Sequence, residues 1–171
     1  MVMGQVSIAV EHNFETAHRL PFLGGKCENL HGHSWKAKFH LQAYELPGGV
    51  DENGISMDFG SAKKVIRQWI DTYIDHGVML GGMDNLLDDI WNDGCKIFIF
   101  GPPDNYQDWI GAYTHKPWPT VESVAEMLCV KIQEALGSDI WIIGVEVTET
   151  ATNSATFTQA VPRIKDVEVD G

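Results

Sequence analysis

Hydrophobic residues in this chain repeat at two intervals, and the order of those intervals restricts the folds that it can adopt. Near both ends of the sequence, apolar residues alternate with polar ones, which is typical of strands with one buried face. Between these segments, apolar residues recur every three or four positions, which is typical of helices buried along one side. Strands are expected at about 6–10, 35–44, 140–150 and 154–160, with 14–18 continuing the first strand past an irregularity, and helices at about 58–76 and 120–137. This order predicts an α+β fold with a four-stranded antiparallel sheet and two helices on one face.

Both expected helices carry recognisable end signals. Asp58 or Ser61 can cap the first helix, which is expected to end shortly after its last apolar residue. Thr120 can cap the second helix, and Gly137 is a typical stop signal. Cys129 lies on the apolar stripe of the second helix, so we expect it to be a core residue rather than a reactive thiol.

The chain is interpreted as one domain over residues 1–171, because this length suits a single hydrophobic core. Residues 81–118 are its least regular part and contain a strand-like run at 96–100. We interpret residues 81–118 as an insertion that forms a lid or an assembly contact. The tail at 163–171 alternates weakly and is expected to be an edge strand or a frayed end.

The formal net charge is −12. Such a surface repels phosphate backbones, so we expect no nucleic-acid binding, although a small phosphorylated substrate remains compatible with a few local cations. No apolar run reaches the length of a membrane span, and the N-terminus lacks the basic and apolar regions of a signal peptide. The three cysteines are widely spaced and odd in number, which argues against a disulfide framework and favours the cytoplasm.

Three histidines and a cysteine lie close together in the sequence. His31 and His33 are two residues apart, so both point to the same side of an extended segment, and His18 can approach them if the first two strands pair. Three imidazoles suit zinc and leave its fourth position open, as in catalytic sites. Cys27 is either a fourth ligand that closes the site or a thiol that loses its proton readily near zinc and Lys26. A chance cluster of surface histidines is the alternative, which the proximity of Cys27 and His18 disfavours.

Each of the other candidate site residues has two interpretations. Asp75 can orient His76 and raise its basicity if the chain bends at the next glycine, or both can form a solvated helix end. Glu149 shares its strand parity with apolar residues, so its carboxylate needs a partner. That partner is either the N–H and NH2 edge of a flat heterocycle such as a pterin or guanine, or water at an exposed strand end. Thr120 and Glu122 either line the same pocket or serve only to cap the second helix.

The pattern of these residues resembles the 6-pyruvoyl-tetrahydropterin synthase and 6-carboxytetrahydropterin synthase family. The matching segments, in the order found in the family, are Phe14–Leu20, Cys27–His33, Ser56–Phe59, Asp75–His76, Pro119–Glu122 and Glu149–Thr150. The resemblance implies zinc ligands His18, His31 and His33, a catalytic base Cys27 with a second acid/base unit Asp75 and His76, and pterin-binding residues Glu149, Thr120 and Glu122. It also implies the tunnelling fold, in which subunits join their sheets into a barrel, commonly as a hexamer of two trimers with active sites between subunits.

The spacing from Cys27 to His31 is similar to that of the carboxy-type branch of the family, which belongs to the queuosine (7-deazapurine) pathway. The resemblance therefore implies a zinc-dependent lyase that converts 7,8-dihydroneopterin triphosphate to 6-carboxy-5,6,7,8-tetrahydropterin and releases acetaldehyde and triphosphate. Arg19 and Lys26 are candidate ligands of the triphosphate.

Three alternatives to this reaction remain open. They are triphosphate elimination without side-chain cleavage, as in a pyruvoyl-type synthase, a non-catalytic zinc- or pterin-binding module, and an unrelated zinc hydrolase with Glu122 or Glu149 as its base. Two features depart from the family pattern. The chain lacks the asparagine that often follows the Asp75–His76 pair, and the connection at 81–118 is long.

Overall fold

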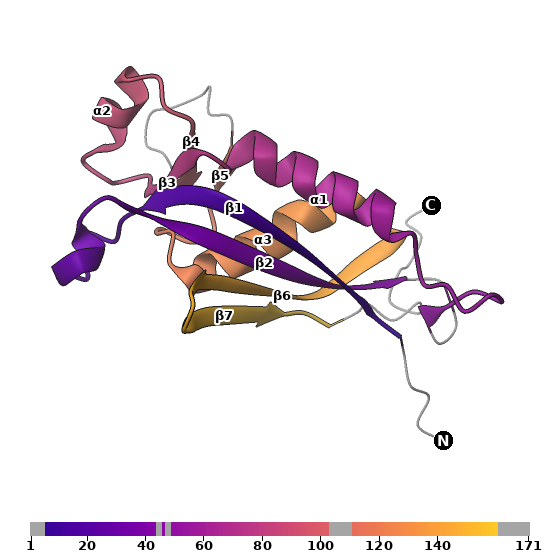
Figure 1. Ribbon diagram of the computed structural model, residues 1–171. Coiled ribbons are helices and arrows are strands. Elements are labelled where there is room, and N and C mark those ends of the chain that lie inside the picture. The colour runs from indigo at the N-terminus through magenta and orange to yellow at the C-terminus, as the bar shows by residue number, and fades with distance from the viewer. Residues whose placement is uncertain (1–5, 44–45, 47–48, 103–110, 161–171) are drawn as a thin grey trace.

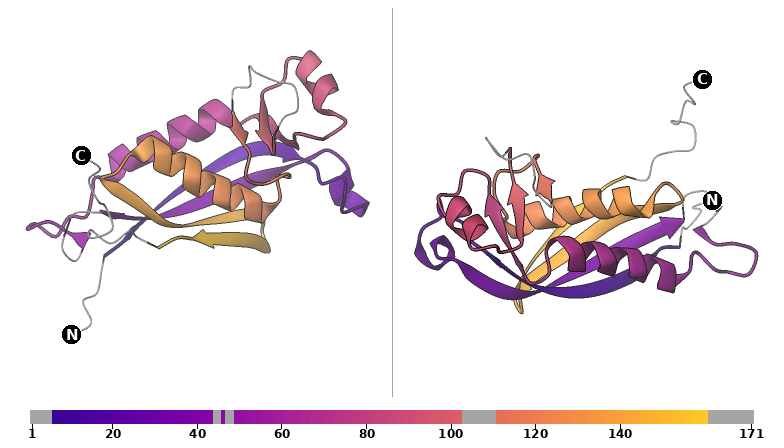
Figure 2. Two further views of the ribbon diagram at one scale, coloured as in Figure 1. Left: turned by 180° about the vertical axis from the view of Figure 1, so that it is seen from behind. Right: turned by 90° about the horizontal axis from the view of Figure 1, so that it is seen from above.

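Two antiparallel hairpins and two long helices form where the residue spacing predicts them. The computed structural model describes residues 6–43, 46, 49–102 and 111–160. The strands are β1 (Ile8–His18), β2 (His31–Ala43), β3 (Gly77–Gly81), β4 (Ile97–Phe100), β5 (Ala112–Tyr113), β6 (Ile140–Thr150) and β7 (Asn153–Thr158). The helices are α1 (Phe59–Tyr73), α2 (Leu87–Asn92) and α3 (Val121–Leu136), with a 3-10 turn, η1, at Gly25–Glu28. Figures 1 and 2 show that α1 and α3 lie on one face of the twisted sheet.

The long strands pair in the expected antiparallel manner. β1 pairs with β2, β2 with β6, and β6 with β7. The β1–β2 register runs without a break from Ile8 opposite Leu41 to His18 opposite His31, so the expected irregularity before residue 14 is absent. The continuous pairing keeps β1 extended as far as His18, which is what brings this residue to the start of β2.

Three of the four predicted helix ends are confirmed, whereas α1 ends at Tyr73, slightly before the expected end near 75–77. Asp58 is the N-cap of α1 and accepts hydrogen bonds from the amides of Gly60 and Ser61. Thr120 is the N-cap of α3 and accepts from the amide of Ser123. The helix α3 ends at Gly137, whose φ of 80° lies in the left-handed region that glycine tolerates best.

The expectation of a four-stranded sheet is wrong. Within the described residues the sheet has seven strands, in the order β5-β4-β3-β1-β2-β6-β7. The strand β3 pairs parallel with β1, β4 with β3, and β5 with β4. All four residues of β4 are buried, so this strand is a short continuous apolar run without the alternation that marks a half-exposed strand. Two short strands of the region at 81–118, β4 and β5, therefore extend the main sheet.

The core lies between this sheet and the two long helices. The largest fully buried side chains include Trp35 and Phe39 of β2 and Ile66 and Ile70 of α1. Cys129 of α3 is also fully buried, as expected, and burial raises the pKa of its thiol to about 12. Its sulfur is therefore a packing group at neutral pH.

Replacing Ile66 by alanine is expected to lower the free energy of unfolding by about 2–5 kcal/mol, because the side chain is fully buried and its loss leaves a cavity. Urea unfolding of the full chain at one fixed protein concentration measures the change. Lys63→Ala, on the exposed side of the same helix, is the matched control and should change the free energy by no more than about 0.5 kcal/mol. Equal effects of the two substitutions would contradict the assigned core.

No helix among the described residues is both long enough and apolar enough to cross a membrane. The tail at 163–171, for which an edge strand or a frayed end was one expectation, lies outside the described residues.

Candidate metal centre and active site

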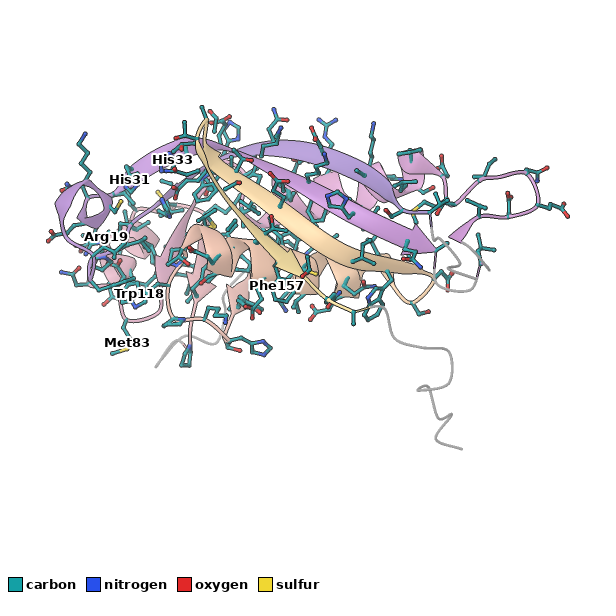
Figure 3. The ribbon with its side chains drawn as sticks, turned by 90° about the horizontal axis from the view of Figure 1, so that it is seen from below. Arg19, His31, His33, Met83, Trp118 and Phe157 are labelled. Carbon is teal, nitrogen blue, oxygen red and sulfur yellow. The ribbon has the colours of Figure 1, made fainter. Side chains whose placement is uncertain are left out.

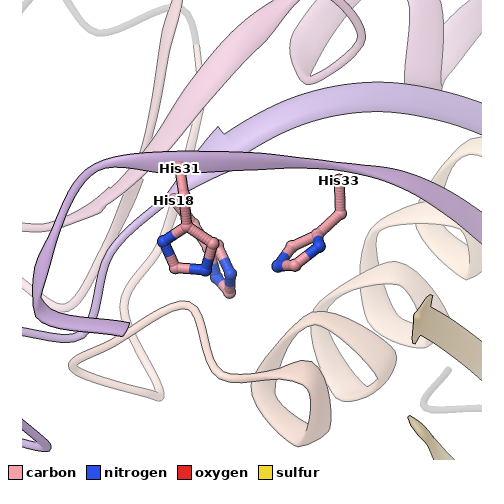
Figure 4. A group of neighbouring side chains, drawn as sticks. All are labelled: His18, His31 and His33. Carbon is pink, nitrogen blue, oxygen red and sulfur yellow. The ribbon is translucent and has the colours of Figure 1, made fainter. Parts of the chain in front are cut away.

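The pairing of β1 with β2 gathers three imidazoles at one end of the sheet. His18 lies opposite His31, and Thr16 lies opposite His33, so alternation places all three histidines on the face that the helices cover. Each of the three offers a potential ligand atom, and these atoms lie within 4.8 Å of one another. Figure 4 shows the rings of His31 and His33 extending from one strand and meeting that of His18. The predicted convergence of the three imidazoles is confirmed.

Backbone carbonyls orient two of these rings. Nδ1 of His18 donates to the carbonyl of Pro119 at 2.9 Å, and Nδ1 of His31 donates to the carbonyl of Asn29 at 2.7 Å. Because a carbonyl only accepts, each Nδ1 carries the proton and each Nε2 keeps a free lone pair. Nε2 of His18 is buried and makes no hydrogen bond within the described part of the chain. A buried lone pair of this kind suits a metal ion, and carbonyl-held imidazoles are the usual zinc ligands.

Burial disfavours the charged form of two of the three imidazoles. Burial lowers the pKa of His18 to about 4, and His31 and His33 act in the same direction, whereas the hydrogen bond to Pro119 opposes them. Burial also lowers the pKa of His33, against the opposing effect of Glu149. Neutral imidazole is the form that binds metal, so the group could hold a divalent ion at neutral pH.

Glu149 points toward the same cluster. Val145 and Val147 of β6 are fully buried, which confirms that the parity of Glu149 puts it on the apolar face. Its Oε1 lies 3.3 Å from Nε2 of His18 and 3.9 Å from Nε2 of His33. Its side chain is only 19% exposed, so the carboxylate lies within the site and does not simply extend into water. It is therefore available to a ligand bound beside the imidazoles.

Cys27 lies on the loop between β1 and β2, within η1, and its thiol is free and exposed. The carbonyl of Cys27 accepts the amide proton of Leu20 at 2.7 Å, which closes the base of this loop. The group of potential metal-ligand atoms found among the described residues contains the three imidazoles but not the Cys27 sulfur. This placement favours an open site over one closed by a fourth ligand. Lys26, in the same turn, is also exposed.

Arg19 has protein partners for its guanidinium. Nε donates to Oδ2 of Asp84 at 3.0 Å, and Nη2 donates to Oδ1 of Asn85 at 2.8 Å. The Asp84 side chain is fully buried. Arg19 therefore has a structural partner that the sequence analysis missed. The sequence signal for such a partner was the position of Arg19 directly after a buried histidine, because a cation placed there needs a counter-ion.

Asp75 and His76 form the expected pair at 2.7 Å between Oδ2 and Nδ1. The bend that allows it lies at His76 itself, whose φ is 53°. Oδ1 of Asp75 accepts the amide proton of Glu15, and the amide of His76 donates to the carbonyl of Glu15. Burial raises the pKa of Asp75, but the Glu15 amide, His76 and Lys96 outweigh burial, so the pKa lies below its usual value. Asp75 is thus an anionic partner for His76.

This pair is separate from the imidazole cluster in the single chain. The pair lies just before β3 begins and is bound to the backbone amide and carbonyl of Glu15 on β1, and not to the side chains of the cluster. The His76 side chain is 78% exposed. Among the described residues, neither Asp75 nor His76 forms a hydrogen bond or an ion pair with the three histidines or with Cys27.

Thr120 and Glu122 lie at the start of α3, next to the carbonyl that orients His18. The Thr120 hydroxyl accepts the amide proton of Ser123, which is the capping role considered in the sequence analysis. Glu122 lies in the first turn and is exposed. A role for either residue in binding a substrate stays a prediction.

Comparison with known proteins gives a consistent picture. The family described as 6-pyruvoyl tetrahydropterin synthase matches residues 7–160. A Synechocystis sp. protein named 6-carboxy-5,6,7,8-tetrahydropterin synthase is 27% identical over 147 residues, which cover 86% of this chain and 88% of that protein. A Halobacterium salinarum protein with the same name, marked as probable, is 26% identical over 140 residues, covering 81% and 77% of the two chains.

The fold has solved counterparts. A structure of Caenorhabditis elegans 6-pyruvoyl tetrahydropterin synthase superposes with a TM-score of 0.59 at 22% identity, covering 91% of this chain and 96% of that chain. At this identity the likeness concerns the fold alone. The match over residues 7–160 covers most of the sequence, and the chain therefore belongs to the 6-pyruvoyl tetrahydropterin synthase family.

Proposed function

We propose that this protein is a zinc-dependent lyase that converts 7,8-dihydroneopterin triphosphate and water to 6-carboxy-5,6,7,8-tetrahydropterin, acetaldehyde and triphosphate. The observation that carries the proposal is the cluster of three imidazoles, in which the buried Nε2 of His18 has no hydrogen-bond partner among the described residues. The names of the Synechocystis and Halobacterium relatives support the carboxy-type product. The three free thiols fit a reducing compartment, and we place the reaction in the cytoplasm.

The site residues have complementary roles in this proposal. His18, His31 and His33 would hold zinc, which when bound supplies a Lewis acid that lowers the pKa of substrate hydroxyl groups. The Glu149 carboxylate would accept two hydrogen bonds from the N–H and NH2 edge of the pterin ring. The Cys27 thiolate would remove a proton from the substrate side chain. Thr120 and Glu122, beside the same cluster, would complete the pterin pocket.

Asp75 and His76 would provide the second acid/base unit, in which the carboxylate holds the imidazole and the imidazole returns protons. Since this pair lies apart from Cys27 and is highly exposed in the single chain, we propose that it serves the site of a neighbouring subunit. A homo-oligomer, formed as a hexamer of two trimers, would then place each active site between subunits.

The triphosphate requires cations on an otherwise acidic protein. Lys26 is the better of the two candidates, because it is exposed in the turn that carries Cys27. Arg19 already binds Asp84 and Asn85, so its contribution would require sharing its guanidinium with these partners. Additional cations would come from a neighbouring subunit.

Product analysis by mass spectrometry, with zinc-loaded protein and 7,8-dihydroneopterin triphosphate, tests the proposal. We expect 6-carboxytetrahydropterin together with acetaldehyde and triphosphate in equal amounts. A pyruvoyl product without acetaldehyde would reject the carboxy-type assignment in favour of simple elimination. Phosphate release with an unaltered pterin would indicate a zinc hydrolase, and binding without any change would indicate a non-catalytic module.

A further inference from the structure

One turn within residues 81–118 contacts two segments that lead to the cluster of imidazoles. We call residues 81–85 the clamp turn, which begins where β3 ends and closes with a hydrogen bond from the amide of Asp84 to the carbonyl of Gly81 at 3.0 Å. The Asp84 residue is 5% exposed, although it carries a carboxylate. A buried carboxylate is costly unless it is fully paired, so its partners indicate what it does.

The first side of the clamp turn holds the residue that follows His18. Oδ2 of Asp84 accepts from Nε of Arg19 at 3.0 Å, while Oδ1 accepts the amide proton of Leu86 at 2.9 Å. The neighbouring Asn85 accepts from Nη2 of the same arginine at 2.8 Å. Two acceptors on the turn therefore fix the planar guanidinium in position and orientation.

Arg19 is connected to the loop that carries Cys27. Arg19 is followed by Leu20, which is 6% exposed and whose amide donates to the carbonyl of Cys27 at 2.7 Å. The base of the loop is therefore anchored at Arg19 on one side and by this backbone hydrogen bond on the other. A displacement of Arg19 would therefore reach Cys27 through Leu20 and its hydrogen bond to the Cys27 carbonyl.

The second side of the clamp turn holds the segment that orients His18. A Cβ atom on Gly81 would lie 2.4 Å from Cε3 of Trp118, so only glycine allows the indole to pack at this point. Trp118 precedes Pro119, whose carbonyl accepts from Nδ1 of His18. Figure 3 shows Arg19, Met83 and Trp118 at the end of the molecule that carries His31 and His33.

We propose that Asp84 is a positioning residue of the active site, because its buried carboxylate, acting through Arg19, holds the loop that carries Cys27. It touches neither the three imidazoles nor Cys27 directly. The clamp turn therefore supports the site indirectly. Only the turnover measurement in the test below rests on the proposed function.

The test uses Asp84→Asn in the full-length zinc-loaded protein, since this substitution removes the charge and keeps the side-chain volume. Alkylation by iodoacetamide, followed by mass spectrometry, compares the exposed thiols of Cys27 and Cys95 within one molecule. We expect the Cys27 rate to change by about threefold or more while the Cys95 rate stays unchanged, because thiol reactivity depends on the surroundings and accessibility of the sulfur, which the position of this loop sets. Loss of an indirect support should also lower kcat by about tenfold with little change in KM.

Two variants complete the design. Glu134→Gln breaks an exposed ion pair with Lys131 outside the site and should leave both thiol rates at their wild-type values. Asn85→Ala removes only the exposed contact to Arg19 and leaves no buried charge unpaired, so it tests the support of Arg19 by the clamp turn if Asp84→Asn does not fold. A change confined to Cys27 in Asp84→Asn or Asn85→Ala supports the proposal.

Equal Cys27 rates in the wild type and the folded variants would overturn the positioning role. The buried Cys129 reports on general unfolding, because a merely destabilised protein would make this thiol reactive as well. Failure of the wild type to release acetaldehyde would overturn the proposed function alone, since alkylation does not depend on turnover.

Discussion

Replacing His33 by alanine is expected to weaken zinc binding by more than about 100-fold and to abolish turnover, because even residues that only support metal ligands are worth 10–100-fold in affinity. His33 is the best of the three histidines for this test. It is partly exposed, whereas His18 is fully buried against Trp35 and its loss would also disturb packing. Competition with a chromophoric chelator measures affinity, and metal analysis of the purified protein measures stoichiometry.

The matched control for this prediction is His40→Ala. His40 belongs to the same strand as His33, but its parity puts it on the opposite face of the sheet. It should bind zinc with wild-type affinity and stoichiometry. If His33→Ala also retained wild-type affinity, the imidazole cluster would be a structural feature and the proposed zinc chemistry would be rejected.

The cluster of three imidazoles was predictable from sequence because it depends on two simple rules. Alternation puts His31 and His33 on one side of a strand, and the pairing of two successive strands brings His18 opposite His31. The parity of Glu149 follows from the same alternation. Neither rule needs knowledge of distant parts of the chain.

Other features of the site could not be predicted in this way. The carbonyl of Pro119 orients His18 from 101 residues away, and every residue carries a carbonyl, so no sequence pattern marks this one. The strands β3 and β4 are short and buried, and without alternation they resemble any apolar run. The counter-ion Asp84 belongs to the same region, which explains why Arg19 was expected to bind phosphate.

The role of the Asp75–His76 pair is harder to predict, because in the proposed function it depends on contacts between chains. Alternation within β1 predicts that Glu15 and His18 have opposite parity, but only the fold shows that the Asp75–His76 pair is bound to Glu15. An imidazole that is 78% exposed, with an anionic partner already in place, is organised for chemistry. The proposal that this pair serves the site of a neighbouring subunit can be tested directly.

Mixing two inactive variants is therefore expected to restore activity. Cys27→Ala and His76→Ala should each lower turnover by about 100- to 10,000-fold, the usual contribution of a positioned acid or base. After dissociation and reassembly in equal amounts, about one site in four should combine an intact Cys27 with an intact His76 from its neighbour, because each is present in half of the chains. Recovery of about a quarter of the wild-type rate would show that the two residues act together across subunits.

The control for this experiment is a mixture of Cys27→Ala with the double variant Cys27→Ala/His76→Ala. Its assemblies contain no intact Cys27, so they should remain inactive at any ratio. Native mass spectrometry confirms that mixed assemblies have formed, and metal analysis confirms that Cys27→Ala keeps its zinc, as a base outside the ligand set should. Mixed assemblies that stay inactive would mean that Asp75 and His76 serve the site of their own chain or none, and the exposed pair would then need the chain to rearrange before it could reach Cys27.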